Sequence, residues 1–361
     1  MGESKDRSKR IKKLWQIVDT ELDGMLITSP ENVRYLSGFS GTEGTMVLTR
    51  SEGFFLTDGR YTTQARQQVK DFTVITFKEK WKEIGRIIKK LKIKSLGFES
   101  RNLTVAFLHD LEKEAPSITL KHYAEALDAL RAVKDAEEIR ILRKAALIAS
   151  ESLQEVIPLI KPGVREIDIA TELEYHMRKK GGDAIAFQTI VASGYCSALP
   201  HGVASKKKIK KGEFVIVDYG VVYQGYSSDE TCTFMVGKPT KKQKRIYETV
   251  KKAHDLAIEA VQHGKPLKEV DDAARSYIEK MGYKKYFSHG TGHGIGLSVH
   301  EPPVVSFRAK GRIKRGMVFT VEPGVYLPRW GGVRIEDTVV VKSSGYELIT
   351  VTDKSLKPIG L

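Results

Sequence analysis

The chain has 361 residues, enough for two domains, and its content of 41% hydrophobic and 29% charged residues is typical of a soluble globular protein. No apolar stretch approaches the roughly 20 residues of a membrane span, and the two cysteines are too few for a disulfide framework. The net charge of +15 is spread over short lysine clusters, such as 205–211 and 238–245, which are typical of solvated loops, so we expect neither a membrane nor a nucleic-acid partner.

The first 128 residues are predicted to form a small α/β domain. Residues 1–15 are charged and contain no apolar signal core, so we expect a cytoplasmic protein. Apolar runs bounded by turn residues predict strands, and two of them, 44–50 and 53–60, predict a β-hairpin. The other predicted elements of this domain are strands at 23–30 and 95–100 and helices at 62–69, 81–92 and 106–115.

The sequence pattern changes near residue 130, and a second domain is predicted to span 129–361. It begins with a long amphipathic helix, 135–160, which Pro162 and Gly163 terminate. Two helices followed by strands occur twice in succession, and this order predicts a domain made of two duplicated halves. The remaining predicted elements are helices at 166–182, 243–263 and 266–281 and strands at 186–194, 213–223, 232–237, 317–327, 332–341 and 346–351.

Four carboxylates interrupt the apolar strands of this second domain. Asp218 and Asp229 lie eleven residues apart on two predicted strands, and Gly225 between them permits a turn. Glu322 and Glu336 repeat the arrangement fourteen residues apart. Each pair is therefore expected to come together on adjacent strands.

These four acids need a strong cation, because a buried carboxylate without a partner is costly. Arg334 is the only arginine in these strands, whereas two divalent ions would balance four carboxylates. The segment 289–301, HGTGHGIGLSVHE, adds three histidines, and its glycines at 292, 294 and 296 are expected to let the backbone approach a metal pocket closely. Carboxylates with one histidine predict a dinuclear site that prefers Mn, Co, Fe or Zn.

Several segments closely resemble the pita-bread metallopeptidases, the family of methionine aminopeptidase, aminopeptidase P and prolidase. In the second domain these segments are 189–202, 217–231, 289–301, 316–326 and 332–339. In the first domain, 26–44 and 57–65 are similar to the creatinase-like leading domain of aminopeptidase P. The resemblance implies an α+β fold, in which a pita-bread catalytic domain with pseudo-twofold halves follows a smaller creatinase-like α/β domain.

The resemblance also implies a ligand set for two divalent metal ions per subunit, with Mn or Co preferred and Zn or Fe as alternatives. The five ligands are Asp218, Asp229, His293, Glu322 and Glu336, of which Asp229 and Glu336 bridge the ions. Two such ions lower the pKa of a shared water, which then attacks the scissile carbonyl of the peptide. Glu322 is the expected proton acceptor in this step.

The remaining polar residues receive roles from the same resemblance. His201 and His300 are expected to hydrogen-bond the substrate or the tetrahedral intermediate. Arg334 is expected to pair with a ligand carboxylate or with substrate, and His289 either supports a ligand or contacts substrate. Phe187 either lines a pocket for proline or is an ordinary core residue.

The substrate class depends on features that differ between branches of the family. The long leading domain favours the proline-specific branch over methionine aminopeptidase. Val304 stands where well-known prolidases have an arginine that helps to bind a free substrate carboxylate, and such a bond contributes roughly 1.5–3 kcal/mol. We therefore expect an Xaa-Pro aminopeptidase, with Xaa-Pro dipeptidase (prolidase) as the alternative, because Arg308 or the leading domain could supply the cation.

Relatives imply a homodimer that acts on peptides. A less favoured alternative is a non-catalytic nucleic-acid- or ribosome-binding member of the fold, but such members commonly lack metal ligands that this chain retains. Two positions depart from the family pattern, with Cys232 where arginine is usual and Ser298 where aspartate is usual. If that arginine and aspartate normally pair, their joint loss leaves no buried charge unpaired.

Overall fold

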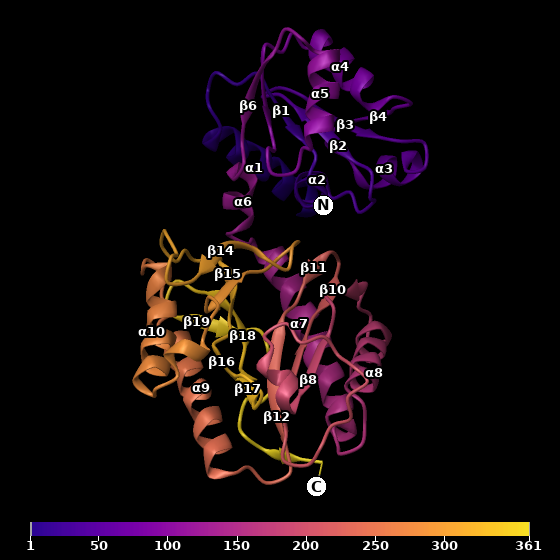
Figure 1. Cartoon of the computed structure of the whole chain (residues 1–361). Helices are drawn as coiled ribbons and strands as arrows, with labels where there is room; N and C mark the ends of the chain where they lie inside the picture. Colours follow the sequence, from indigo (N-terminus) through magenta and orange to yellow (C-terminus); the bar gives the residue numbers. More distant parts are fainter. Residues whose placement is uncertain (1, 361) are drawn as a thin grey trace. The chain divides into compact units, whose positions relative to one another are not determined.

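The computed structural model describes residues 2–360 (Figure 1). The chain divides into two compact units, Met1–Arg131 and Ala132–Leu361. The division lies at the end of helix α6 (Ala126–Arg131), three residues beyond the boundary at 128/129 expected from the sequence. Arg131 explains why the helix belongs to the first unit, because its buried guanidinium donates to Asn32 Oδ1 at 3.0 Å. Within residues 2–360, none of the helices has the length and apolar character that a bilayer crossing requires.

A six-stranded sheet with the order β4-β3-β2-β1-β5-β6 forms the centre of the first unit. The predicted hairpin is confirmed, since β2 and β3 pair antiparallel with Met46 opposite Phe55. β1 and β2 are also antiparallel, whereas β3–β4, β1–β5 and β5–β6 are parallel. The strands are β1 (Gly24–Ile27), β2 (Thr45–Leu48), β3 (Gly53–Thr57), β4 (Thr73–Thr76), β5 (Ser95–Phe98) and β6 (Thr119–His122).

The helices of the first unit include three that the sequence analysis missed, α1, α2 and the α6 described above. α1 (Gly2–Ile17) was interpreted only as a charged terminus, yet it buries Leu14 and Trp15. α2 (Pro30–Ser37) begins at the N-cap Ser29 and was also missed. The predicted helices are α3 (Thr62–Gln68), α4 (Lys80–Lys90) and α5 (Val105–Glu114), and the apolar stripe of α4 packs into a core with β-strand residues such as Leu26 and Phe54.

The first half of the second unit consists of two helices and an antiparallel ladder. α7 (Ala136–Val156) begins with a capping box, in which Asp135 accepts from the backbone N–H groups of Glu137 and Glu138. α8 (Glu166–Lys179) packs beside it. The strands are β7 (Ala184–Ile185), β8 (Ile190–Ser193), β9 (Phe214–Tyr219), β10 (Val221–Tyr223), β11 (Tyr226–Ser227) and β12 (Glu230–Val236). Their sheet orders are β11-β10-β7 and β20-β12-β9-β8, in which β20 (Pro358–Ile359) comes from the end of the chain.

The second half repeats this order of helices and strands. α9 (Lys241–Glu259) and α10 (Leu267–Lys280) precede a five-stranded sheet with the order β14-β13-β15-β18-β19. A separate hairpin joins β16 and β17. The strands are β13 (Gly292–Gly294), β14 (Glu301–Val305), β15 (Val318–Val321), β16 (Gly324–Leu327), β17 (Gly331–Arg334), β18 (Asp337–Val341), β19 (Tyr346–Leu348) and β20 (Pro358–Ile359).

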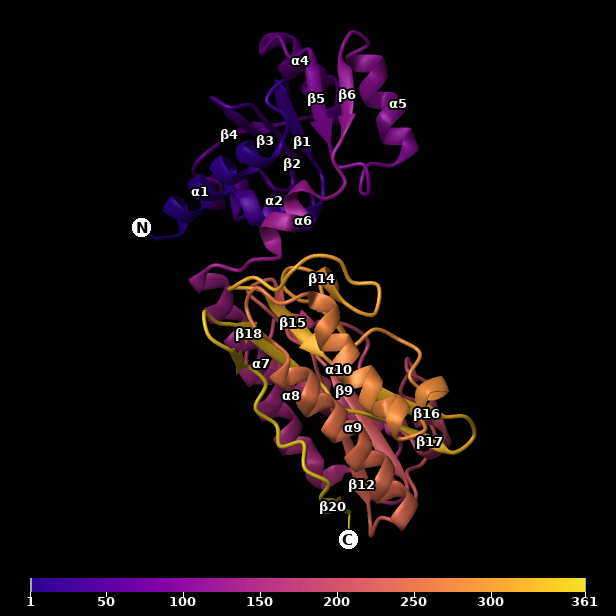
Figure 2. The same cartoon turned by 90° about the vertical axis from the view of Figure 1, so that its left-hand side faces the viewer.

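Two hydrophobic cores lie between the helices and the strands of the second unit. One packs α7 and α8 against β9 and β12, and the other packs α9 and α10 against β15 and β18. Figure 1 shows the two helix pairs on opposite sides of the strands. The chain after β19 then runs along the unit to β20, which pairs in parallel with β12 (Figure 2). The strands are thus sandwiched between the helix pairs, and polar side chains between the two ladders are shielded from water.

Candidate metal centre

The ten side chains to which the sequence analysis gave a metal-binding, catalytic or substrate-binding role all line a single cavity of the second unit. Its volume is about 530 Å³. The ten residues are Phe187, His201, Asp218, Asp229, His289, His293, His300, Glu322, Arg334 and Glu336.

Strand register brings the first pair of acids together. Asp218 lies in β9 and faces Thr231 of β12 across the ladder. Asp229 is two residues before Thr231, so it extends from the same face at the start of β12. The predicted pairing on adjacent strands is therefore seen in the structure.

The second pair of acids occupies matching places on β15 and β18. Val321, the last residue of β15, pairs with Asp337, the first residue of β18. Glu322 follows Val321 and Glu336 precedes Asp337, so both acids lie just beyond the same end of the ladder. Each half of the unit thus supplies two carboxylates from the ends of paired strands.

Three of the predicted ligands lie close enough to share an ion. One ligand atom from each of Asp229, His293 and Glu336 lies within 4.8 Å of the others. His293 Nε2 is also 3.4 Å from Glu322 Oε1 and 3.5 Å from Asp229 Oδ2. Because the Nδ1 of His293 faces the carbonyl oxygen of Gly294 at 3.2 Å, Nδ1 is the donor, and the Nε2 lone pair points to the acids.

The donor atoms of this cluster fit a bound cation. Asp218 Oδ1 and Glu336 Oε1 are buried, and neither has a hydrogen-bond partner among the described residues. Unsatisfied buried carboxylate oxygens are rare, because each forfeits its hydration without compensation. Oxygen atoms beside one imidazole nitrogen suit divalent Mn, Co, Fe or Zn.

The electrostatics of the cluster support the same conclusion. Burial and the charge of Glu336 raise the pKa of Asp229 well above its usual range, and burial and Glu322 do the same to the pKa of Glu336. Burial also raises the pKa of Glu322. The acids repel one another in the absence of a cation, and a divalent ion would restore their ionised forms.

Arg334 of β17 is fully occupied by contacts within the protein. Its guanidinium donates to Asp218 Oδ2, to the carbonyl oxygen of Pro200 at 2.9 Å and to Tyr326 OH at 2.8 Å. A further bond from Nε reaches Thr231 Oγ1 at 3.2 Å. Of the two partners expected from the sequence, the structure therefore pairs Arg334 with a carboxylate of the site.

His289 is bonded to the protein through both ring nitrogens. Nδ1 lies 2.7 Å from the carbonyl oxygen of Gly290, and Nε2 lies 2.9 Å from Tyr326 OH. Since the carbonyl can only accept and Tyr326 already accepts from Arg334, Tyr326 donates to Nε2 of a neutral imidazole. Burial lowers the pKa of His289, which is consistent with that neutral form. The ring holds Tyr326 and Arg334 in place.

The other three predicted residues present surfaces to the cavity. His201 and His300 are exposed, and the His300 ring centroid lies 4.0 Å from that of His293. Partial burial and the nearby His293 lower the pKa of His300. Phe187 is half-buried and lines the cavity, so it is not an ordinary core residue.

The glycines of 289–301 are required by close packing. A Cβ on Gly292 would lie 1.8 Å from the carbonyl oxygen of Thr320 in β15, and one on Gly294 would lie 2.2 Å from that of Pro302. A Cβ on Gly296 would meet Glu301. Close packing of β13 and the segment after it against neighbouring chain segments requires these glycines. Gly292 also lines the cavity, and the predicted close approach of this backbone to a metal stays a prediction.

Cys232 points away from Asp229, as the strand alternation predicts. Its sulfur lies 3.1 Å from Lys354 Nζ, so the cation near this position comes from the C-terminal segment. Burial raises the pKa of Cys232 to about 12, and the side chain is a neutral thiol. The supposed pairing between positions 232 and 298 stays a prediction.

Two polar residues of the site were not found from the sequence. Thr231 donates to Glu336 Oε2 at 2.6 Å, and strand alternation from Asp229 was the signal that would have found it. Tyr326 had no local signal, because its link to Arg334 depends on the register of β16 and β17.

Comparison with known proteins places the chain among peptidases. A model for metallopeptidase family M24 matches residues 140–343, and one for the Creatinase/Prolidase N-terminal domain matches residues 10–133. The Xaa-Pro dipeptidase of Pyrococcus horikoshii is 40% identical over 351 residues, which cover 97% of this chain and 99% of that protein.

Solved structures give the same result. The Xaa-Pro dipeptidase from Bacillus anthracis is 40% identical with a TM-score of 0.95, covering 97% of this chain and 99% of that one. The X-Pro aminopeptidase from Thermotoga maritima is 34% identical with a TM-score of 0.89, covering 94% and 98% of the two chains.

Proposed function

Because this chain belongs to metallopeptidase family M24, we propose that it is a metal-dependent Xaa-Pro dipeptidase, or prolidase. The predicted family and fold class are confirmed by the family and structure matches. The dipeptidase assignment is carried by near full-length similarity to proteins named Xaa-Pro dipeptidase. It replaces the aminopeptidase that we expected from Val304.

The proposed metal site consists of Asp218, Asp229, His293, Glu322 and Glu336. Its support is the cluster of ligand atoms within 4.8 Å and the two buried carboxylate oxygens without partners. Two divalent ions, Mn or Co in preference to Zn or Fe, would supply a Lewis acid and lower the pKa of bound water.

The side chains of the site would bind the substrate and move a proton. Glu322, at the cavity wall, is the proposed acceptor of the proton from the attacking water. His201 and His300 are exposed donors at the cavity and would hydrogen-bond the peptide carbonyl as negative charge develops on it. Phe187 would pack against the proline ring.

Arg334 and His289 are proposed to position other groups and not to contact substrate. The guanidinium of Arg334 donates to four protein groups, and both ring nitrogens of His289 are bonded to protein atoms. Arg334 holds Asp218 and, through Tyr326, His289. This assignment differs from the substrate contacts considered from the sequence.

A second candidate, Xaa-Pro aminopeptidase activity, is favoured by one observation. Among the described residues that line the cavity, Arg334 is the only lysine or arginine, and its guanidinium is already bonded. Val304 lines the same cavity and is 59% exposed, and Arg308 lies outside it. A free substrate carboxylate therefore has no unpaired Lys or Arg in this cavity, whereas a longer peptide needs none.

Hydrolysis of three matched substrates tests the two candidates. Metal-free protein is loaded with Mn²⁺ or Co²⁺ and given an Xaa-Pro dipeptide, an Xaa-Pro-Xaa tripeptide and Met-Ala, with and without chelator. The proposal predicts chelator-sensitive hydrolysis with the highest kcat/KM for the dipeptide. A higher kcat/KM for the tripeptide supports the aminopeptidase candidate, and a metal-loaded protein that cleaves neither proline peptide contradicts both.

A further inference from the structure

The two strands that carry Asp229 and Glu336 also carry buried acids on their other face. Side chains alternate along a strand, so Glu230 and Cys232 point away from the cavity side that Asp229 and Thr231 occupy. Asp337 likewise follows Glu336 and points the other way. Glu230 is 1% exposed and Asp337 is 4% exposed, so both carboxylates are removed from water. Neither belongs to the ligand set.

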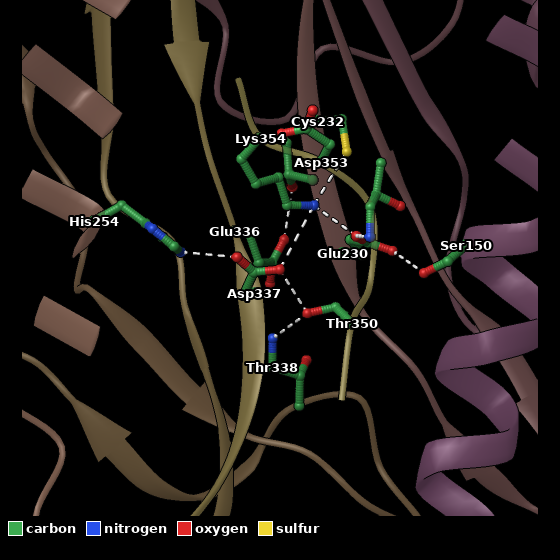
Figure 3. A network of polar contacts seen from close by, with 12 residues as sticks. Ser150, Glu230, Cys232, His254, Glu336, Asp337, Thr338, Thr350, Asp353 and Lys354 are labelled. Atoms are coloured by element: carbon green, nitrogen blue, oxygen red, sulfur yellow. Dashed lines mark hydrogen bonds and ion pairs between the residues drawn. The ribbon is translucent and has the colours of Figure 1, made fainter. Parts of the chain in front are cut away.

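Lys354 places its ammonium between these two acids. Figure 3 shows the ammonium between the side chains of Glu230, Asp337 and Cys232. Nζ lies 2.6 Å from Glu230 Oε1, 3.7 Å from Asp337 Oδ1 and 3.1 Å from Cys232 Sγ. The lysine comes from the segment between β19 and β20 and is itself buried. A buried lysine is costly unless it is paired, and here it has two anionic partners.

Neutral donors hold the far sides of both acids. Glu230 Oε2 accepts from Ser150 Oγ at 2.7 Å and from Tyr219 OH at 2.6 Å. Asp337 Oδ1 accepts from Thr350 Oγ1 at 2.6 Å.

His254 completes the set of neighbours. Its Nε2 lies 3.2 Å from Asp337 Oδ2. Among the residues that the structure describes, Lys354 is nevertheless the only Lys or Arg paired with Glu230 or Asp337. Burial alone would lower the pKa of Lys354, but Cys232, Glu230 and Asp337 beside the ammonium raise it well above its ordinary value, and the side chain is charged.

This ion pair lies across the junction of β12 and β18. That junction sets the distance between the proposed ligands Asp229 and Glu336. On the cavity side, Thr231 Oγ1 donates to Glu336 Oε2 at 2.6 Å. Along the backbone, Glu336 N–H donates to Thr231 O at 3.2 Å, and Thr338 Oγ1 donates to Asp229 O at 2.9 Å. On the opposite side, the junction is held by Lys354 between Glu230 and Asp337.

We propose that Lys354 is a positioning residue for the metal centre, because its ammonium draws Glu230 and Asp337 together and so fixes the separation of Asp229 and Glu336. The inference rests on the proposed metal site. Without the ammonium, two buried carboxylates face each other across the junction of β12 and β18. Their repulsion would separate the strands whose ends present the two ligands, and metal affinity would fall.

The test compares metal binding with stability in three variants. Lys354→Met keeps the length of the side chain and removes its charge, and Lys354→Arg restores the charge. Lys207→Met is the matched control, because Lys207 Nζ pairs with Glu213 at 2.7 Å in another largely buried site, away from the cavity. Mn²⁺ titration calorimetry of metal-free protein, Co²⁺ absorption spectra and thermal unfolding of the metal-free form are measured for each.

We expect Lys354→Met to raise the Kd for Mn²⁺ by about 10- to 100-fold, the usual effect of removing a residue that supports metal ligands, and to change the Co²⁺ spectrum. Lys354→Arg should recover much of the affinity. Lys207→Met should lower the unfolding temperature while leaving the Kd and the spectrum unchanged.

Three outcomes would overturn the inference. If Lys354→Met has the Kd for Mn²⁺ and the Co²⁺ spectrum of wild type, the role of Lys354 is purely structural, even if the metal-free variant is less stable. If Lys207→Met loses as much affinity for Mn²⁺ as Lys354→Met, the weaker binding follows from the loss of any largely buried lysine and not from the position of Lys354. Wild-type protein that binds no Mn²⁺ or Co²⁺ overturns the metal site as well, which distinguishes the two failures. If Lys354→Met does not fold, Lys354→Gln, which keeps a donor to Glu230, replaces it with the same criteria.

Discussion

At the scale of single residues, the chemistry of the cavity was largely predictable because it depends on residue type. Carboxylates on buried strands need a cationic partner wherever the fold places them. The structure places all four around one cavity, namely Asp218, Asp229, Glu322 and Glu336. The partners of Arg334 and His289 were not predictable, because their bonds run through Tyr326 from a separate hairpin. Strand register decides such contacts, and a local sequence pattern does not contain it.

Val304 is the residue at which the preference for dipeptide or tripeptide substrates can be changed. It lines the cavity and is exposed, so a longer cationic side chain fits there without burying a charge. Val304→Arg is expected to raise kcat/KM for an Xaa-Pro dipeptide relative to the tripeptide by about tenfold or more, because a charge-assisted bond to carboxylate contributes roughly 1.5–3 kcal/mol. Paired kinetics on the two peptides check this, with Val304→Met as the uncharged control. An unchanged ratio would mean that the substrate carboxylate lies elsewhere.

At the scale of elements, helices and strands with a strong period were predicted well. The helix α7 shows this best, because Asp135 and Glu138 form a capping box ahead of an apolar stripe. The missed helix α1 is the opposite case, since its charged sequence conceals the few residues, such as Leu14 and Trp15, that tertiary packing buries. The tight packing around β13 was also unpredictable, because Gly292 and Thr320 meet only through the sheet.

Gly292 tests how tightly β13 packs. A Cβ there would overlap the carbonyl oxygen of Thr320, and because that oxygen belongs to the backbone of β15 it cannot move aside easily. Gly292→Ala is expected to destabilise the protein by about 1–3 kcal/mol, a usual cost of overpacking. Gly59→Ala is the control, because nothing lies within 4 Å of its Cβ position. Urea unfolding measures the free energy of unfolding of both variants. Equal values for Gly292→Ala and Gly59→Ala would contradict this account of β13.

The ion pair between α7 and β19 should make part of the protein's stability depend on pH in the acid range. Arg143 hydrogen-bonds Glu347 and, with Lys342, lowers the pKa of that carboxyl from 4.5 to about 2. The unfolded chain therefore takes up this proton near pH 4.5 and the folded chain only near pH 2. The contribution is present above pH 4.5 and is lost as the pH falls towards 2.

Glu347→Gln removes this titration. We expect the unfolding free energy of the variant to fall less steeply than that of wild type between pH 4.5 and 2. Denaturant unfolding at several pH values in that window measures the slope. Parallel pH profiles for the two proteins would show that the ion pair makes no measurable contribution.

At the scale of the whole molecule, the second unit is two similar halves whose strand ends meet around one cavity. The duplicated order of helices and strands was visible in the sequence, and the family match confirms the fold. The contact between the halves could not be predicted from the sequence. Lys354 and Glu230 are 124 residues apart and meet only when the C-terminal segment packs beside β12. The homodimer and the identity of the metal stay predictions.

The most direct test of the central claim is an anomalous difference map from crystals of the protein loaded with Mn²⁺. The account predicts two peaks roughly 3.5–4 Å apart, the usual spacing in two-metal sites. Asp229 and Glu336 should contact both peaks, and Asp218, His293 and Glu322 should complete the coordination. Peaks that avoid these side chains, or a cavity without any peak at saturating Mn²⁺, would contradict it.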